Sequence, residues 1–269
     1  MASSHPSGQG PLNGMVLAAA TPCTGAAKCH DRRMQTHPIQ WYITAPQPCP
    51  YLQGREMQTV LVDPAARLRS DHYGRLLGEG FRRSGQFVYR HQCPSCRACI
   101  PVRIPVTKFR PGRAQRRCLH RNADLDVRHV RRPDLDEHMT LFRRYLDARH
   151  PGGGMESTTR DDYAGMLSER ACGVLLFEHR LGSELLAVAV TDVTPRGLSA
   201  MYSFFDPNRP ERSLGTYAIL RQIDEARRMG LPHLYLGYWI PGSEKMDYKT
   251  RFRPVEGRAN GAWRRIGTQ

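Results

Sequence analysis

Residues 173–239 read GVLLFEHRLGSELLAVAVTDVTPRGLSAMYSFFDPNRPERSLGTYAILRQIDEARRMGLPHLYLGYW. The runs GVLLFEHR, ELLAVAVTDVT and GLSAMYSFF each have the length and apolar content of a strand, and the short turns LGS and TPRG separate them. The next segment predicts a helix that begins with Ser213 as N-cap and stops at Gly230 as its C′ residue. HLYLGYW at 233–239 predicts a further strand. This order of a meander, a helix and a strand predicts an α+β domain.

The residues before this stretch predict two further helices of the same domain and, N-terminal to them, a separate smaller domain. Leu135, Met139, Phe142 and Leu146 recur at helical spacing in residues 134–149, and another helix is expected at about 158–169. Residues 1–33 are rich in Ser, Gly, Pro and Ala and are expected to be disordered, with Met34 as an alternative start. We therefore expect a basic, Cys-containing α+β domain at 34–132 and a second domain at 133–269. The first should hold strands at 59–63, 86–90 and 100–106 and helices at 71–79 and 113–121.

The charge of the chain favours a polyanionic partner. The 269 residues include 40 Lys and Arg against 25 Asp and Glu, which gives a formal net charge of +15. All but four of the cations are arginines, so a GC-rich genome is one explanation of the excess. Between Phe81 and Arg132, however, thirteen arginines and Lys108 face only Asp124 and Asp126. Because arginine forks bind phosphate oxygens, this local excess predicts a nucleic-acid surface.

The expected cellular location rests on the membrane and export signals that the sequence does not show. No run of about 18 apolar residues is present, which excludes a membrane-spanning helix. No Lys or Arg precedes the first short apolar run, as it would in a signal peptide. Eight cysteines are too few for a disulfide scaffold of this length. We expect a cytoplasmic monomer with reduced thiols.

Two segments carry the residue types that chemistry needs. The turn in DPNRPERSLGTYAI, from Asp206, presents Arg212, Ser213 and Gly215 at a helix start, where free N–H groups bind anions; a capped helix with surface arginines is the alternative. GYWIPGSEKMDYKTRFRP, at 237–254, concentrates aromatics, carboxylates and two of the four lysines. Lys245 and Lys249 are four residues apart and would share one helical face. The alternative for them is an ordinary exposed pair.

Both segments resemble a known family. The order of the expected elements is that of the GNAT acyltransferases. Residues 201–256 resemble the C-terminal region of the aminoacyl-tRNA protein transferases, in Y-F/Y-D-P, S-L-G-x-Y and K-M-x-Y-K-x-x-F/Y-x-P. CPYL at 49–52 and GFRRSGQFVYRHQCPSCRACIPVRIPV from Gly80 resemble the N-terminal region of the same family. The bacterial aspartate/glutamate leucyltransferases are the most similar branch.

The resemblance implies a GNAT-like aminoacyl-transfer domain and its reaction. Leucine would pass from leucyl-tRNA to the α-amino group of proteins with N-terminal Asp or Glu, which creates an N-degron for proteolysis. No cofactor is required for this chemistry. One rival is a CoA-dependent N-acetyltransferase of the same fold, because fold alone does not determine function. The other rival is a noncatalytic RNA-binding or metal-sensing protein.

The candidate residues have distinct expected roles. Catalysis, by positioning the amine or accepting its proton, is assigned to Asp206, Asp247, Tyr248 and Lys249. An acceptor carboxylate needs a cation, for which Arg82, Arg83 and Lys249 are candidates. A leucyl side chain needs an apolar pocket, expected around Met201, Tyr202, Phe204, Tyr238 and Trp239. The other expected substrate-binding residues are Arg209, Arg212, Ser213, Gly215, Tyr217 and Lys245. The expected tRNA-binding residues are Arg103, Arg110, Arg113, Arg116 and Arg117.

The cysteines suggest a metal site. Cys93, Cys96 and Cys99 form CxxCxxC, and Cys49 could supply a fourth thiolate for zinc or an iron–sulfur cluster; buried reduced thiols are the alternative. Eukaryotic relatives have a CxxC pair where this chain has CPYL, with Leu52 in place of the second Cys. Cys118 and Cys172 fall on apolar patterns and are expected in the core. Ser243 replaces a Cys of the eukaryotic pattern, so direct attack by the substrate amine is expected instead of a thioester intermediate.

Overall fold

A twisted eight-stranded sheet organises the molecule, and the computed structural model describes residues 39–149 and 157–266 of the chain. The prediction of disorder for residues 1–33 therefore lies outside the described residues. Across the sheet the strands run in the order β14 (Ala262–Ile266), β13 (Val255–Ala259), β7 (Ile100–Pro105), β12 (His233–Trp239), β11 (Gly197–Phe205), β10 (Glu184–Thr194), β9 (Gly173–Leu181) and β8 (Asp126–Val130).

The expected meander is confirmed. β9, β10 and β11 pair antiparallel in succession, and the turns between them contain Gly182 and Gly197, both at positive φ. A Cβ at Gly197 would lie 2.3 Å from the carbonyl oxygen of His233, so this turn accepts only glycine. β11 then joins β12 in parallel. The chain between them contains η2 (Pro210–Arg212) and α5 (Leu214–Arg228), as the sequence predicts.

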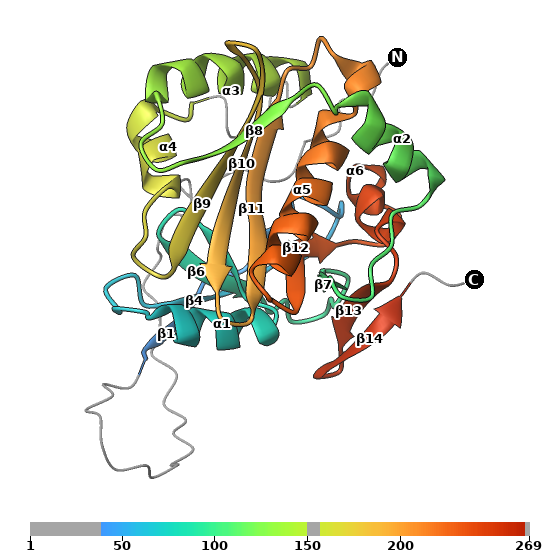
Figure 1. The fold of residues 1–269 in the computed structure, drawn as a ribbon. Coiled ribbons are helices and arrows are strands. Elements are labelled where there is room, and N and C mark those ends of the chain that lie inside the picture. Colours follow the sequence, from blue (N-terminus) through green and yellow to red (C-terminus); the bar gives the residue numbers. More distant parts are fainter. Residues whose placement is uncertain (1–38, 150–156, 267–269) are drawn as a thin grey trace, which may run out of the picture.

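Helices cover both faces of the sheet (Figure 1). α5 packs on one face, where Tyr217, Leu220 and Ile223 join the largest core cluster, and α2 (Arg113–Arg121) lies beside it. α5 ends as expected, because Gly230 follows its last turn in the left-handed conformation. Ser213 occupies the N-cap position, as expected, although it is left-handed and its side chain makes no capping hydrogen bond. α3 (Leu135–Arg149) and α4 (Arg160–Met166) form a second core cluster with β9, β10 and β11.

A smaller sheet packs against the large one. It has the order β1 (Trp41–Ile43), β4 (Thr59–Val62), β6 (Phe87–His91) and β5 (Arg82–Ser84), and α1 (Ser70–Gly78) shares its core cluster. Tyr235 of β12 belongs to that cluster too, so the two sheets share apolar contacts. β2 (Gln47–Pro48) pairs with β3 (Glu56–Met57), and α6 (Glu244–Asp247) with η3 (Tyr248–Arg251) follows β12.

The large sheet crosses the boundary expected between residues 132 and 133. β7 lies between β13 and β12, and β8 forms the edge beside β9, although both strands fall in the range 34–132. The coarse expectation of a mixed α/β fold is confirmed. The division into two domains stays a prediction, and the end of the small sheet does not coincide with it. No helix in residues 39–149 and 157–266 is long and apolar enough to cross a membrane.

Candidate functional site

The strands β11 and β12 separate before they reach their C-terminal ends. Their parallel pairing is limited to Leu198 with Leu234 and Ser199 with Tyr235, and β12 shifts its register against β7 immediately afterwards. Arg82 of β5 fills the gap, where its Nη2 donates to the carbonyl oxygens of Ala200 and Met201 at 3.3 and 3.5 Å. In α/β sheets, ligands bind beyond the C-terminal ends of strands where neighbouring strands part. A binding site is therefore expected at this edge of the sheet.

A glycine in β12 makes room for Arg82. Gly237 has a φ of +81°, and a Cβ there would overlap the Arg82 guanidinium. The Nη1 atom of Arg82 is buried and has no hydrogen-bond partner among the described residues. A buried guanidinium that keeps a free donor is costly unless an anion completes it. This feature keeps Arg82 among the candidates for binding an acceptor carboxylate.

Arg83, the neighbouring candidate, is occupied by an internal ion pair. Its Nε and Nη2 donate to Oδ1 of Asp192 at 3.0 and 2.5 Å, and Tyr73 donates its hydroxyl to Oδ2 at 2.9 Å. Arg83 is only 3% exposed and also donates to the carbonyl oxygens of Gly85, Met166 and Ser168. With every donor engaged, Arg83 ties the small sheet to β10, and the structure gives it no means of contacting substrate.

Lys249 lies in the interior beside this gap. It is 2% exposed and donates its ammonium protons to the carbonyl oxygen of Tyr238. Burial, and secondly the charge of Arg82, lower the pKa of Lys249 to about 7, while Cys99 acts in the opposite direction. Near neutral pH both protonation states are therefore populated, which is the condition a proton acceptor needs.

The two lysines do not share a face. Lys245 is exposed on α6, whereas Lys249 is buried, because the chain tightens from the α-helix α6 into the 3₁₀ turn η3 at Tyr248. The expectation of one lysine-bearing helical face is wrong. Asp247 accepts a hydrogen bond from Nε1 of Trp239 at 3.1 Å. Tyr248 is 40% exposed, and burial of its hydroxyl end, with the nearby Tyr145, raises its pKa to about 12.

Asp206 occupies the turn that follows β11. It is 3% exposed, and its Oδ1 accepts the backbone N–H of Asn208 at 3.1 Å. Nη1 of Arg144 and Nε of Arg209 lie 3.9 and 4.0 Å from Oδ2, beyond hydrogen-bond distance. Asp206 follows the C-terminal end of β11, whereas Asp247 and Lys249 follow the C-terminal end of β12. Because these two strands are parallel, all three residues lie at the same edge of the sheet.

The two arginines expected to make an anion site on this turn already have partners. Arg209 donates through Nη2 to both carboxylate oxygens of Glu184 at 3.2 and 2.9 Å. Arg212 forms a two-point contact with Asp124, with both bonds at 2.9 Å. Gly215 begins α5 under the Phe205 ring, where a Cβ would lie 2.9 Å from the ring edge. The turn is therefore stabilised internally by both arginines, and Gly215 is required by packing.

The expected leucyl pocket divides into buried and accessible residues. Met201, Phe204, Tyr217 and Tyr238 are buried, with Phe204 fully enclosed in the cluster under α3 and the Tyr238 hydroxyl donating to the Gly80 carbonyl oxygen at 2.9 Å. Phe204 and Tyr238 therefore face the interior, and an apolar leucyl pocket around them stays a prediction. Tyr202 and Trp239 are partly exposed.

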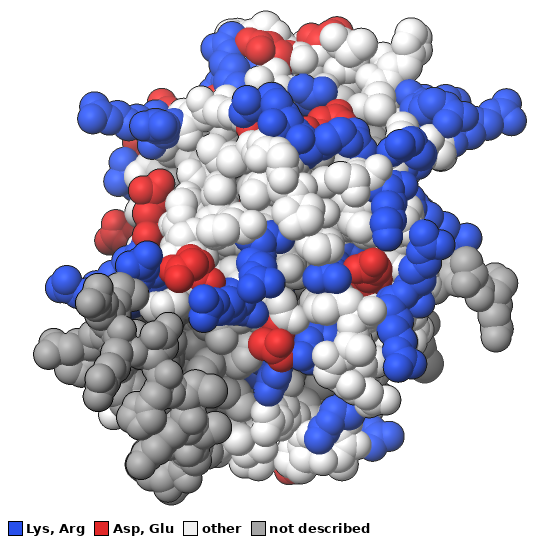
Figure 2. All heavy atoms as spheres, turned by 60° about the horizontal axis from the view of Figure 1, so that its bottom comes forward, with Lys and Arg blue, Asp and Glu red and all other residues white. Residues whose placement is uncertain are grey.

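The expected tRNA-binding arginines fall into two groups. Arg113, Arg116 and Arg117 are exposed on α2, and Arg110 is exposed just before it. Arg103 differs, because its Nε donates to Glu256 at 2.8 Å and its guanidinium lies over the Trp263 ring at 4.3 Å. Figure 2 shows that basic side chains also surround an uncharged central area on the lower side of the molecule. Of the expected tRNA-binding arginines, those on α2 are therefore exposed to solvent, where a phosphate could reach them.

The four cysteines of the expected metal site are neighbours. Burial, followed by the charges of Cys93, Cys49 and Cys96, raises the pKa of the Cys99 thiol to about 12. Even so, no group of three or more His, Cys, Asp or Glu side chains in the described part of the chain has an arrangement that would hold a metal ion. A metal on these thiols stays a prediction. Cys118 and Cys172 are buried, as expected.

Arg144 is a residue of this edge that no sequence pattern singles out. It lies on the exposed face of α3, which looks in the sequence like any solvated helix face. Only the tertiary structure brings this face to the turn after β11. A second arginine, Arg143, lies beside it.

Comparisons with known proteins identify the family. The family models described as "Arginine-tRNA-protein transferase, N terminus" and "Arginine-tRNA-protein transferase, C terminus" match residues 47–117 and 137–258. The chain is 47% identical to an aspartate/glutamate leucyltransferase of Pseudomonas aeruginosa over 225 residues, which cover 84% of this chain and 96% of that protein. It is 46% identical to the protein of that name from Thiobacillus denitrificans over 228 residues, which cover 85% and 95%.

A solved structure, L-PGS from Bacillus licheniformis, matches 55% of this chain and 49% of its own with 11% identity and a TM-score of 0.43, which is too partial a likeness to support an argument. The sequence relatives match at nearly their full length, and both halves of the chain match the same family in the family's own order. The chain therefore belongs to the arginine-tRNA-protein transferase family, in its aspartate/glutamate leucyltransferase branch.

Proposed function

We propose that this protein transfers leucine from leucyl-tRNA to the α-amino group of proteins that begin with Asp or Glu. The observation that carries the proposal is the 47% identity to a named aspartate/glutamate leucyltransferase across 96% of that protein. A leucine added in this way is a destabilising N-terminal residue, which places the reaction in an N-degron pathway. GNAT-like architecture for the transfer domain, cytoplasmic location and a monomeric state belong to the same proposal.

The reaction exchanges an ester for an amide. The lone pair of the acceptor amine attacks the ester carbonyl carbon of leucyl-tRNA, a C–N bond forms, and the C–O bond to the terminal ribose breaks. The amine gives up one proton, and the departing ribose oxygen takes up one. The ester is already activated, so alignment of the amine and acceptance of its proton are the main tasks of the enzyme.

Lys249 is the best-supported proton acceptor. Its buried amine has a pKa of about 7, because burial and Arg82 both disfavour the ammonium form. Asp247, held by the Trp239 indole, and Asp206, held by the N–H of Asn208, are proposed to position the amine. Tyr248 is proposed as a hydrogen-bond donor to the oxyanion, since its raised pKa keeps its hydroxyl protonated.

Recognition of an acidic acceptor requires a cation that has no internal partner. Arg83 is excluded by its pair with Asp192, and Lys249 donates to the Tyr238 carbonyl oxygen and is proposed as the proton acceptor, which leaves Arg82. Arg82 carries a buried donor without a partner among the described residues. An acceptor carboxylate would complete this donor set and compensate its charge, whereas Asn or Gln would not compensate the charge.

The donor surface is proposed on α2. The exposed arginines of this helix would contact tRNA phosphates, and Tyr202 and Trp239 would contact the leucyl side chain at the sheet edge. No metal or cofactor is needed for ester aminolysis.

A transfer assay tests the function. The purified protein is incubated with labelled leucyl-tRNA or arginyl-tRNA and with peptides that begin with Asp, Glu, Asn or Ala. We expect label from leucyl-tRNA on the Asp and Glu peptides alone. Preferential arginine transfer would overturn the donor assignment. Acetylation from acetyl-CoA in place of aminoacyl transfer would identify an N-acetyltransferase, and RNA binding without transfer would identify a noncatalytic protein.

A further inference from the structure

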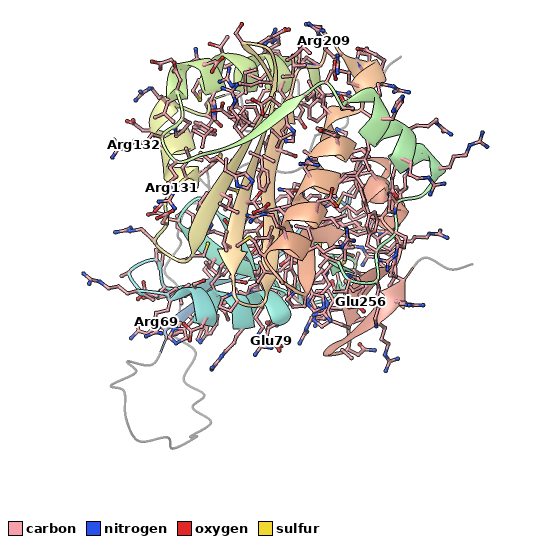
Figure 3. All side chains as sticks on the ribbon, viewed as in Figure 1. Arg69, Glu79, Arg131, Arg132, Arg209 and Glu256 are labelled. Atoms are coloured by element: carbon pink, nitrogen blue, oxygen red, sulfur yellow. The ribbon has the colours of Figure 1, made fainter. Side chains whose placement is uncertain are left out.

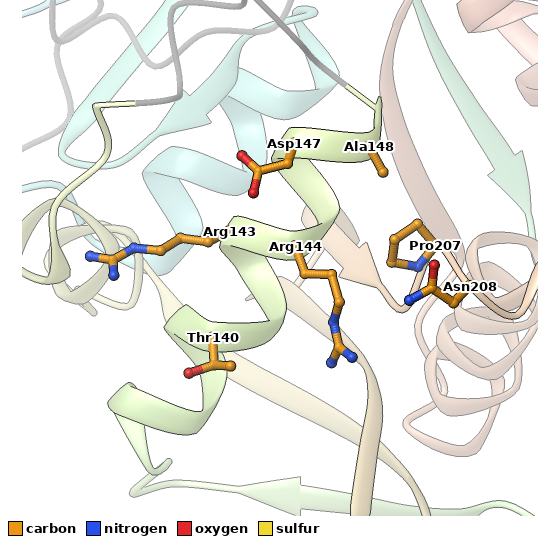
Figure 4. A pocket seen from close by; sticks show the side chains of 7 residues that line it. All are labelled: Thr140, Arg143, Arg144, Asp147, Ala148, Pro207 and Asn208. Atoms are coloured by element: carbon orange, nitrogen blue, oxygen red, sulfur yellow. The ribbon is translucent and has the colours of Figure 1, made fainter.

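An open hollow lies beside Asp206 and plays no part in the site described above. It measures about 590 Å³ and is bounded by one face of α3 and by the turn after β11 (Figure 4). Thr140, Arg144 and Ala148 recur every four residues along that helix face, and Pro207 and Asn208 close the other side. Its lining is mixed, with Arg143, Arg144 and the Asp147 carboxylate beside apolar surface. Its mouth is wide, which suits a segment of a large ligand better than an enclosed small molecule.

Arg144 is the available cation of this hollow. Its side chain is 43% exposed, and its separation of 3.9 Å from Asp206 exceeds hydrogen-bond distance. In Figure 4, Arg144 lies on the side of α3 that faces Asn208, whereas Arg143 extends away from the turn. By contrast, Arg209 and Arg212 on the neighbouring turn give their donors to Glu184 and Asp124. An anion that reached this edge would therefore meet the exposed guanidinium of Arg144, which is paired with Asp206 at 3.9 Å but gives it no hydrogen bond.

The hollow is connected to the basic face of α2 through the same turn. At the C-terminal end of α2, Arg121 donates to the carbonyl oxygen of Glu211, and Asn122 donates to that of Arg212 at 2.8 Å. The turn then runs back from Arg212 to Asn208 at the rim of the hollow. A chain of phosphates lying on α2 would thus reach the hollow by following this turn.

We propose that the hollow binds a phosphodiester near the 3′ end of the donor tRNA, with Arg144 as the charged contact and the Asn208 side-chain amide as a neutral donor. The inference rests on the proposed function, because it assigns part of the same donor. A guanidinium fork and amide or hydroxyl donors are the groups that bind phosphate oxygens without reading sequence. The contact holds the single-stranded end of the tRNA. The ester itself would lie at the C-terminal ends of β11 and β12.

The test compares a donor that has phosphates with one that has none. KM for leucyl-tRNA is measured between 50 and 200 mM salt for the wild type, for R144Q and for R69Q. Arg69 is an exposed arginine at the opposite end of the molecule from the turn that carries Arg209 (Figure 3) and lies outside the arginine-rich stretch 81–132, so R69Q is the control. Leucyladenosine, which has no phosphate, is measured as a competitive inhibitor, so that its turnover is not required.

We expect R144Q to raise KM for leucyl-tRNA at low salt and to leave kcat unchanged, as for a contact made equally in the ground and transition states. Removing one phosphate contact to single-stranded nucleic acid lowers the log–log salt slope by about 0.7, so the KM of the wild type should rise about 2.6-fold more than that of R144Q over this salt range. R144Q should leave the inhibition constant of leucyladenosine unchanged, and R69Q should have the KM and salt slope of the wild type.

Other outcomes separate the alternatives. Equal losses for leucyl-tRNA and leucyladenosine would mean that Arg144 acts on Asp206 and would overturn the phosphate contact. An unchanged KM and salt slope in R144Q would remove the hollow from the path of the donor. Failure of the wild type to transfer leucine at all would instead refute the proposed function, before any variant is compared.

Discussion

The buried ion pair between Arg83 and Asp192 allows a stringent test of how the two sheets are held together. Replacing Arg83 with Met keeps much of the side-chain volume and removes the charge and all its donors. Asp192 is fully buried, so its carboxylate would be left with the 2.9 Å hydrogen bond from Tyr73 and the Cys172 thiol, and with no cation beside it. The carbonyl oxygens of Gly85 and Met166, now bonded at 2.8 and 3.1 Å, would also lose their donor.

The expected cost follows from these losses. Breaking a buried ion pair on one side costs about 3–5 kcal/mol, because the remaining charge is left without compensation. Domains are stable by about 5–15 kcal/mol in total, so R83M should lose about a fifth or more of the free energy of unfolding. The double variant R83M/D192N removes the stranded charge as well, and it should be more stable than R83M alone.

Chemical denaturation of the wild type, both single variants and the double variant measures the coupling between the two residues. A change below about 1 kcal/mol in R83M would refute the argument from burial, since that is the range of exposed pairs. Selective loss of Asp and Glu acceptors in a stable R83M would show that Arg83 contacts substrate after all. Both results would reverse the structural role assigned here.

The remaining predictions concern the lysine, the basic helix and a packed glycine. Lys249 has a folded pKa of about 7, below its unfolded value, so the unfolded state binds more protons between pH 7 and 10.5, and stability should rise with pH across that window. K249M should abolish this rise in pH-dependent denaturation, and an unaltered profile would mean that Lys249 is not the group responsible. G215A should cost about 1–3 kcal/mol by overpacking against the Phe205 ring, and a thermal shift within error of the wild type would show that the ring moves freely. Replacing three of the exposed arginines of α2 with Gln should lower the salt slope of tRNA binding by about 0.9 for each duplex phosphate that is no longer bound, and a filter-binding series that keeps the wild-type slope would move the tRNA surface elsewhere. The residues replaced in that variant are Arg113, Arg116 and Arg117.

The local elements and the family could be predicted from the amino-acid sequence. Helix α2 and strand β12 occupy the predicted residues 113–121 and 233–239, and α3 begins one residue later than expected. These elements follow from the spacing of apolar residues and from turn residues a few positions away, which are local properties of the chain. The motifs around Asp206 and Lys249 identified the family because their order along the chain is specific.

Which side chains have partners depends instead on the folded chain as a whole. Arg83 and Asp192 are 109 residues apart, and nothing near either one in the sequence indicates the pair. Arg82 and Arg83 look equivalent as neighbours, yet alternation along β5 turns one into the gap at β11 and the other toward β10. β7 likewise joins the large sheet only through pairing with strands far along the chain. Such choices depend on long-range packing and desolvation, whose energies are set by the whole fold and not by any local pattern.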